Sequence, residues 1–166
     1  MLKKLKLNRI NFEKDCTQLE ILVDAVSRNQ SIESIDLSCN DLSDRYGNIV
    51  SQFVQSQIEL REEQQWRESL RVGRKPYITA INRGITELIL HDNNLGKSFI
   101  ESLSMRIRYD DVLRFVDLRY NNLNSQLLLK MLKTICRNKI LVGLDVRGNK
   151  GYNDNVGVQR TLSQFL

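Results

Sequence analysis

The residues of this sequence that could carry out chemistry are few and lie far apart. His91 is the only histidine, so a serine or cysteine nucleophile would have to use it as a base, and no nucleophile motif accompanies it. No glycine-rich phosphate-binding motif is present, and Asn153-Asp154-Asn155 lacks the ligand spacing of a calcium loop. We therefore predict that the protein is not an enzyme and uses no cofactor, metal or small-molecule substrate.

The three cysteines do not suggest a metal site either. Cys16, Cys39 and Cys136 are widely spaced and form no Cys-x-x-Cys pair, so neither zinc nor a disulfide framework is indicated. Cys39 follows a predicted strand, and Cys136 lies on the apolar side of a predicted helix. We expect buried thiols in a reducing cytosol.

A repeated pattern of leucines determines where all of these residues lie. Residues 113–123 fit the pattern LxxLxLxxNxL, which is the strand-and-turn half of a leucine-rich repeat. The other four copies begin at Leu2, Ile32, Ile85 and Leu141. The intervals from residue 85 to 113 and from 113 to 141 are equal, and the interval from 2 to 32 is slightly longer. The interval from 32 to 85 is nearly twice as long. This spacing predicts about five repeats with an insertion at about residues 59–84.

The period, about 28 residues, is at the long end for leucine-rich repeats and leaves room for a strand and a full α-helix. Apolar residues recur at helical spacing between the predicted strands, for example at Phe99, Leu103 and Ile107. We predict an α/β solenoid of ribonuclease-inhibitor-like leucine-rich repeats, with a parallel sheet on the concave side and helices on the convex side. It is expected to form a single domain over residues 1–166. No apolar run reaches the length of about 18 residues that a membrane span needs, so none is expected.

The predicted turn after each of the last four strands contains an asparagine. A side-chain amide at this position both donates and accepts hydrogen bonds, so it can satisfy backbone groups that the turn leaves unpaired. We predict a structural column of asparagines rather than a catalytic one, formed by Asn40, Asn93, Asn121 and Asn149.

Two columns of side chains are predicted on the concave face, because outward residues of parallel strands align across the sheet. The candidates for partner binding here are His91, Arg119 and Arg147. In the alternative interpretation the aspartates neutralise the arginines and the face is a solvated charge ladder. The columns run through Lys6, Asp36, Ile89, Asp117 and Asp145, and through Asn8, Ser38, His91, Arg119 and Arg147.

The helix predicted after the second strand is longer than the others. Strong helix formers continue it through residues 59–71, and Gly73 with the only proline, Pro76, ends it. Insertions in solenoids commonly lie on a binding side. The candidate partner-binding residues of the insertion are Trp66, Leu70, Arg71, Arg74 and Lys75.

Two interpretations of this insertion remain open. Trp66 and Leu70 lie one helical turn apart and could dock onto a partner, or Trp66 could pack back onto Phe53 or Ile58 of its own repeat. Glutamates are interleaved with the arginines, among them Arg61, and the net charge of +5 is modest. We therefore expect a solvated helix face here and no nucleic-acid site.

The insertion and the last repeat resemble one known family. The segments that look similar to the centrosomal protein 78 family are Trp66-Arg67-Glu68-Ser69-Leu70-Arg71, Arg74-Lys75-Pro76, Gly84-Ile85-Thr86-Glu87-Leu88 and Val142-Gly143-Leu144-Asp145-Val146-Arg147-Gly148-Asn149. Gly73 is one residue extra relative to that family, Lys75 replaces an arginine, and the family's C-terminal coiled-coil region has no counterpart in this sequence. The resemblance implies a location at a centriole, basal body or ciliary axoneme.

These observations favour a non-catalytic scaffold or adaptor that binds other proteins within a large cytoskeletal or ciliary assembly. The expected location is the cytoplasm and cytoskeleton, at the centrosome, basal body or cilium, and no membrane partner is expected. The alternative is a leucine-rich-repeat regulator of an enzyme. Such a regulator would be a small-GTPase activator that presents Arg119 or Arg147, or a ubiquitin-ligase component.

Overall fold

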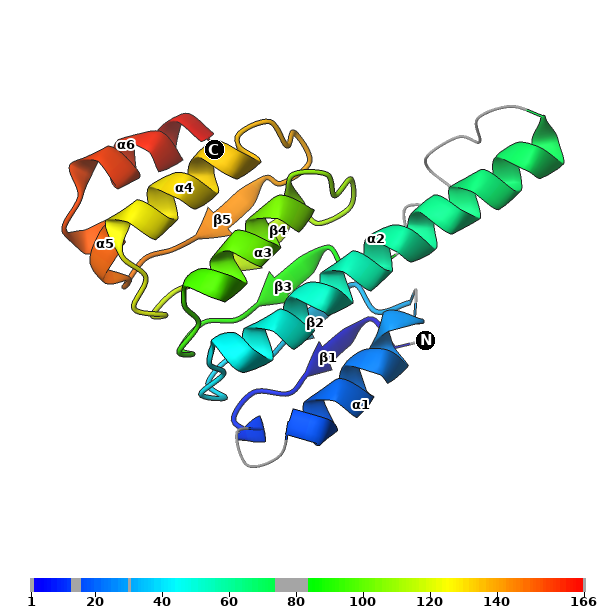
Figure 1. Cartoon of the computed structure of the whole chain (residues 1–166), viewed down its shortest axis with the longest axis horizontal. Coiled ribbons are helices and arrows are strands. Elements are labelled where there is room, and N and C mark those ends of the chain that lie inside the picture. The colour runs from blue at the N-terminus through cyan, green and yellow to red at the C-terminus, as the bar shows by residue number, and fades with distance from the viewer. Residues whose placement is uncertain (1, 13–15, 30, 74–83, 166) are drawn as a thin grey trace.

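Figure 1 shows the computed structural model of the chain, which describes residues 2–12, 16–29, 31–73 and 84–165. Strands and helices alternate along the chain until two helices follow each other at the end. The elements are β1 (Lys4–Lys6), α1 (Cys16–Ser27), β2 (Ser34–Asp36), α2 (Asp44–Val72), β3 (Glu87–Ile89), α3 (Lys97–Ile107), β4 (Phe115–Asp117), α4 (Ser125–Ile135), β5 (Gly143–Asp145), α5 (Lys150–Asn153) and α6 (Val156–Phe165).

The five strands form one sheet in chain order, β1 to β5, and every neighbouring pair is parallel. Each three-residue strand places its middle side chain toward the helices and its first and third side chains on the opposite face. The prediction of an α/β fold with a parallel sheet is confirmed. The middle residues, which the strand register aligns, are Leu5, Ile35, Leu88, Val116 and Leu144.

The helices lie side by side over one face of the sheet, and the core fills the space between the two layers (Figure 1). Apolar residues at helical spacing supply the helix side of this core, as the sequence predicts, and Phe53, Phe99 and Leu103 are at most 1% exposed. No helix of the described residues covers the other face of the sheet, which we call the open face. Asp36, Ser38 and their aligned neighbours lie there.

Helix α2 differs from its neighbours in length. It has 29 residues, whereas α1 has 12 and α3 and α4 have 11 each. Its C-terminal part extends well beyond the ends of the other helices (Figure 1). Gly73 ends it in the left-handed conformation at φ 68°, which glycine adopts without strain. Arg74, Lys75 and Pro76 lie outside the described residues, so the predictions made for them remain predictions.

The expectation of buried thiols is wrong for Cys136. Cys136 immediately follows the last residue of α4, where the chain turns away from the core, and its thiol is exposed and hydrogen-bonds to the carbonyl oxygen of Lys133. Cys39 is partly buried. No group of three or more potential metal ligands is found among the described residues. None of the described helices is long and apolar enough to cross a membrane.

Candidate functional site

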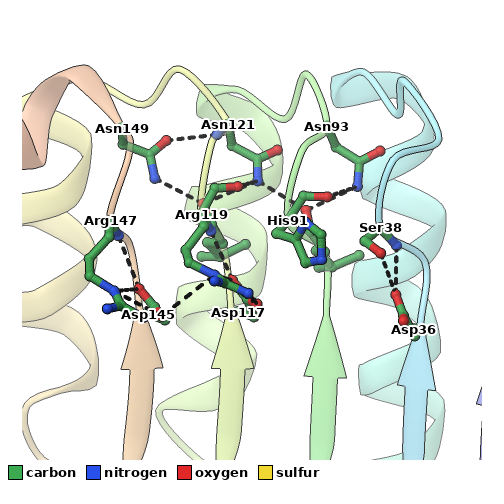
Figure 2. Close-up of polar contacts among 12 residues, drawn as sticks. Asp36, Ser38, His91, Asn93, Asp117, Arg119, Asn121, Asp145, Arg147 and Asn149 are labelled. Carbon is green, nitrogen blue, oxygen red and sulfur yellow. Dashed lines mark hydrogen bonds and ion pairs between the residues drawn. The ribbon is translucent and has the colours of Figure 1, made fainter. Parts of the chain in front are cut away.

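The turn after each of the strands β2 to β5 contains an asparagine whose amide joins neighbouring repeats. Figure 2 shows those of Asn93, Asn121 and Asn149. Asn121 donates from Nδ2 to the carbonyl oxygens of Leu90 and Leu118 at 3.0 and 3.1 Å, and its Oδ1 accepts from the backbone N–H of Leu95 at 3.2 Å. The Oδ1 of Asn149 accepts in the same way from the N–H of Asn121 at 3.0 Å. These bonds satisfy buried backbone groups of two repeats at once, so the amides hold the turns together. The exposed fraction is at most 8% for each of Asn40, Asn93, Asn121 and Asn149.

Below this column, the open face carries a continuous series of ion pairs (Figure 2). The guanidinium of Arg119 binds Asp117 in its own repeat, with Nη2 2.7 Å from Oδ2, and its Nε lies 3.5 Å from Asp145 Oδ2 of the next repeat. The guanidinium of Arg147 in turn binds Asp145 at 2.6 Å. We call these four residues the charge ladder. Its charges are neutralised locally, as the alternative interpretation of the concave face expects.

The ladder shifts the pKa values of Asp145, Arg119 and Arg147. Burial raises the pKa of Asp145, but hydrogen bonds from the side chain and backbone of Arg147 and the charges of Arg147 and Arg119 outweigh it, so the pKa lies below its ordinary value. The pKa of Arg119 is raised, chiefly by its hydrogen bond to Asp117. Both arginines are therefore held in place as cations by acids of this chain.

His91 occupies the same column as Arg119 but is not a member of the ladder. Its residue is partly buried, and its carbonyl oxygen accepts hydrogen bonds from the N–H of Cys39 at 3.0 Å and from Nδ2 of Asn93 at 3.4 Å. The imidazole makes no hydrogen bond or ion pair within the part of the chain that the structure describes. No serine or cysteine close to it forms a nucleophile–base pair there, and we find no arrangement suited to catalysis.

The first part of α2 is fixed to the body by a buried ion pair. Arg61 Nη2 lies 2.5 Å from Asp110 Oδ2, and the two side chains are 8% and 2% exposed. The other carboxylate oxygen of Asp110 accepts from the backbone N–H groups of Val112 and Leu113 at 2.7 and 2.6 Å. Gly84 packs against this arginine, since a Cβ there would lie 3.2 Å from its Nη1. Arg61 thus fixes α2 next to Gly84, shortly before β3.

This role of Arg61 was not predicted, because it was grouped with the solvated arginines of the insertion. That grouping is wrong for Arg61. A signal was present in the sequence, since Arg61 lies three positions after Ile58 and seven after Val54 and therefore on the buried stripe of the helix. Its acidic partner is 49 positions away, and no local pattern identifies it.

The C-terminal part of α2 leaves the body of the protein (Figure 1). We call residues 62–72, which follow Arg61 in this helix, the projecting segment. Trp66 and Leu70 are each 64% exposed, so the alternative in which Trp66 packs back onto Phe53 or Ile58 is not what the structure shows. The reason is geometric, because Trp66 lies more than three turns beyond Phe53 on one helix, a separation of about 20 Å along the axis. The predicted pair Trp66 and Leu70 is thus free on one side of the helix, one turn apart.

Within the part of the chain that the structure describes, the polar contacts of the projecting segment are all local. Arg67 pairs with Glu63 at 2.6 Å, and Arg71, a predicted partner-binding residue, pairs with Glu68 at 3.5 Å. Such exposed pairs on one helix contribute only a few tenths of a kcal/mol. The predicted partner-binding residues therefore form two separate groups. Trp66, Leu70 and Arg71 lie on the projecting segment, and the structure does not bring them together with His91, Arg119 or Arg147 on the open face.

Comparison with known proteins gives structural neighbours only. No family model matches the chain, and no curated protein does. Among solved structures it is similar to the actin-binding site 2 of leiomodin-1, with a TM-score of 0.72 and 13% identity over 99% of this chain and 78% of that chain. It is also similar to the tropomodulin C-terminal domain of Caenorhabditis elegans, with a TM-score of 0.70 and 14% identity over 99% and 82% of the two chains. At these identities the likeness shows the fold. It does not bear on the resemblance to the centrosomal protein 78 family, which stays a prediction.

Proposed function

We propose that this protein is a non-catalytic scaffold or adaptor that binds other proteins of the cytoskeleton. The observation that carries the proposal is the projecting segment. A helix that leaves the body and exposes a tryptophan and a leucine has no folding role there, because neither side chain is buried in the core. Tryptophan is also one of the residues that most often dominate protein–protein interfaces.

Two resemblances support a cytoskeletal partner. One solved structure that shares the fold is described as an actin-binding site of leiomodin-1, and another is described as a tropomodulin C-terminal domain. The second resemblance is that of residues 66–71, 84–88 and 142–149 to the centrosomal protein 78 family. From it we propose a location at a centriole, basal body or ciliary axoneme, and we propose that the repeats belong to the ribonuclease-inhibitor-like class.

The charge ladder gives no support to the alternative, a regulator that presents an arginine to an enzyme. A small-GTPase activator of that kind needs an arginine that can reach the nucleotide of another protein. Arg119 is bound to Asp117 and close to Asp145, and Arg147 is bound to Asp145. Moving Arg119 leaves the carboxylate of Asp117 unpaired, and moving Arg147 leaves Asp145 with only the longer contact to Arg119. We therefore place the function on the projecting segment and not on the arginines of the open face.

Locating a tagged, full-length protein in ciliated cells tests the proposal. We expect it at the centrosome or ciliary base, with proximity labelling of a reproducible set of cytoskeletal proteins. The Arg147→Ala variant should label the same set, since it removes a 63% exposed side chain at the edge of the ladder. A diffuse protein that labels the same proteins as the free labelling enzyme would contradict the scaffold. Loss of a labelled enzyme in Arg147→Ala alone would favour the regulator.

A further inference from the structure

The last strand of the sheet, β5, is paired along one edge only. The N–H of Leu118, next to β4, donates to the carbonyl oxygen of Asp145 at 2.7 Å, and the N–H of Gly143 is bonded on the same side. Successive residues of a strand present their backbone groups to opposite sides, so Leu144 and Val146 present theirs away from β4. No strand of the described residues pairs with β5 on that side, which we call the free edge.

The earlier repeats show how such an edge is paired. In each of the first four, the residue two positions after the middle of the strand donates its N–H to the next strand at 2.7–2.9 Å. These residues are Leu7, Leu37, Leu90 and Leu118. Val146 is the fifth of the series, and the described chain supplies no acceptor for its N–H. The same register would place a sixth parallel strand with its three residues opposite Gly143, Leu144 and Asp145.

A hollow of about 440 Å³ runs along the free edge. The chain around β5 contributes the consecutive residues 142–147 to its lining, and α5 and α6 contribute Tyr152, Gln159 and Leu162 among others. Because side chains of a strand alternate between the two faces of the sheet, a hollow that touches all of residues 142–147 lies at the edge itself. It is open to a partner, since the first and last of these residues, Val142 and Arg147, are 68% and 63% exposed.

The charge ladder ends at the same edge, with Arg147 (Figure 2). One repeat earlier, Arg119 binds Asp117 of its own repeat and also lies 3.5 Å from Asp145 of the next one. Arg147 binds Asp145 of its own repeat, and within the described residues no acid of a following strand lies beside it. In the register of the other strands, that acid would be the residue of a sixth strand opposite Asp145.

We propose that the free edge of β5 binds an extended segment of another protein as a sixth parallel strand, in which an apolar residue is followed directly by an Asp or Glu. The apolar side chain enters the hollow between Leu144 and Leu162, and the acid pairs with Arg147. Strand addition is a common mode of peptide recognition, in which main-chain hydrogen bonds supply affinity and alternate side chains supply specificity. A second copy of this chain would instead place Lys6 of its β1 beside Arg147, so charge favours another protein.

This site lies on the last repeat, apart from the projecting segment, and the inference goes beyond the proposed function. Because a three-residue strand makes few hydrogen bonds, its contact supplements the projecting segment and does not replace it. The two sites can therefore be tested separately.

A displayed library of linear peptides, about nine residues long, is the probe for this proposal. Selection against the full chain should enrich an apolar residue followed by an Asp or Glu. Gln159→Trp, which places a large side chain in the hollow, should weaken synthetic copies at least about tenfold. The matched control is Gln126→Trp on α4, at an exposed position outside the hollow, which should bind like the unmodified chain. Arg147→Ala should abolish the preference for the acid but, as an exposed pair, weaken binding only about two- to fivefold.

Methylation of the peptide backbone tests whether the peptide binds as a strand. A methyl on the amide of the acid blocks the N–H that faces β5, whereas a methyl on the amide of the apolar residue lies on the side away from β5. We expect the first to weaken binding at least about tenfold and the second less than about twofold. Bound peptide should also slow the amide exchange of Leu144 and Val146, which in the free chain should be faster than that of Leu118.

The proposal is overturned if the two methylated peptides bind equally well, or if bound peptide leaves the exchange of Leu144 and Val146 unchanged. It is also wrong if the chain alone forms an assembly that Gln159→Trp dissociates, because a second copy would then occupy the edge. A selection that is empty, or that enriches no acid, would count against it as well. None of these measurements uses the labelled neighbours in cells, so the strand site and the scaffold function can fail independently.

Discussion

The repeating body and the projecting segment differ in how far along the chain their polar side chains make contacts. In the body, a polar side chain is fixed by the neighbouring repeat, as Asn121 is by the carbonyl oxygen of Leu90, 31 positions earlier in the chain. In the projecting segment, the ion pairs between described residues reach three or four positions along the same helix, as from Glu63 to Arg67. The body therefore determines its own structure through long-range contacts, whereas the surface of the projecting segment is available to a partner.

The boundary between the two regions is the buried pair of Arg61 and Asp110. It fixes α2 to the body, and the C-terminal part of the helix extends beyond the other helices (Figure 1). The comparison therefore makes a graded prediction. Substitutions should cost most at this boundary, less in the asparagine column, little in the charge ladder, and almost nothing in the projecting segment.

The largest loss of stability is expected for Arg61→Ala. It leaves the carboxylate of Asp110 buried without its cation, which typically costs about 3–5 kcal/mol. The free energy of unfolding from urea titration measures the loss. Arg67→Ala, which removes an exposed arginine of the same helix, is the matched control and should lose less than about 1 kcal/mol. Equal losses in the two variants would mean that α2 is not fixed to the body at Arg61.

The next largest loss is expected for Asn121→Ala. It leaves the carbonyl oxygens of Leu90 and Leu118 and the N–H of Leu95 without the amide, at a cost of about 1–3 kcal/mol. Thermal unfolding should show a clearly lower midpoint. The control is Asn153→Ala, which removes an exposed asparagine side chain. The neighbouring Asn122 is not used, because its positive φ of 60° would strain an alanine. An unchanged midpoint for Asn121→Ala would contradict the structural role of the column.

The body could be predicted from the sequence because one physical requirement recurs in it. Each strand needs an apolar side chain such as Leu88 or Val116 against the helices and an amide in the turn that follows, so the spacing alone gives the fold and the register. The same regularity also predicted that the aspartates of the open face would lie next to the arginines. Position in the repeat determined the surroundings of these residues.

The site could be predicted only in part. The extra length after the second strand indicated an insertion, and the lone tryptophan indicated a docking residue, but the sequence left open whether Trp66 packs on its own helix. The hollow between α2 and α3 was not predicted, because Met105, Arg106 and Tyr109, which line it, belong to a regular repeat and lie next to α2 only in the folded chain. Arg61 was misassigned for the same reason, since its partner Asp110 is distant in sequence.

A small, pH-dependent effect is expected from the charge ladder. The pKa of Asp145 is lower in the folded protein than the value of about 3.9 for an unfolded aspartate, so the ladder stabilises the fold above that pH. This contribution, of about 0–1 kcal/mol for an exposed pair, is lost as the pH falls through the lower folded value. Unfolding midpoints of the unmodified chain and Asp145→Asn should therefore differ at pH 7 and converge toward pH 2. A constant difference across this range would contradict the assignment.

The most direct test of the division into body and projecting segment is the double variant Trp66→Ala with Leu70→Ala. Both side chains are 64% exposed, so we expect the thermal midpoint of the unmodified chain within experimental error and the loss of the cytoskeletal proteins labelled in cells. The control, Ile21→Ala with Val156→Ala, removes two similarly exposed apolar side chains elsewhere and should keep both the midpoint and the labelled proteins. An unfolded double variant would place the pair in the core, and an unchanged set of labelled proteins would show that the projecting segment is not the binding site.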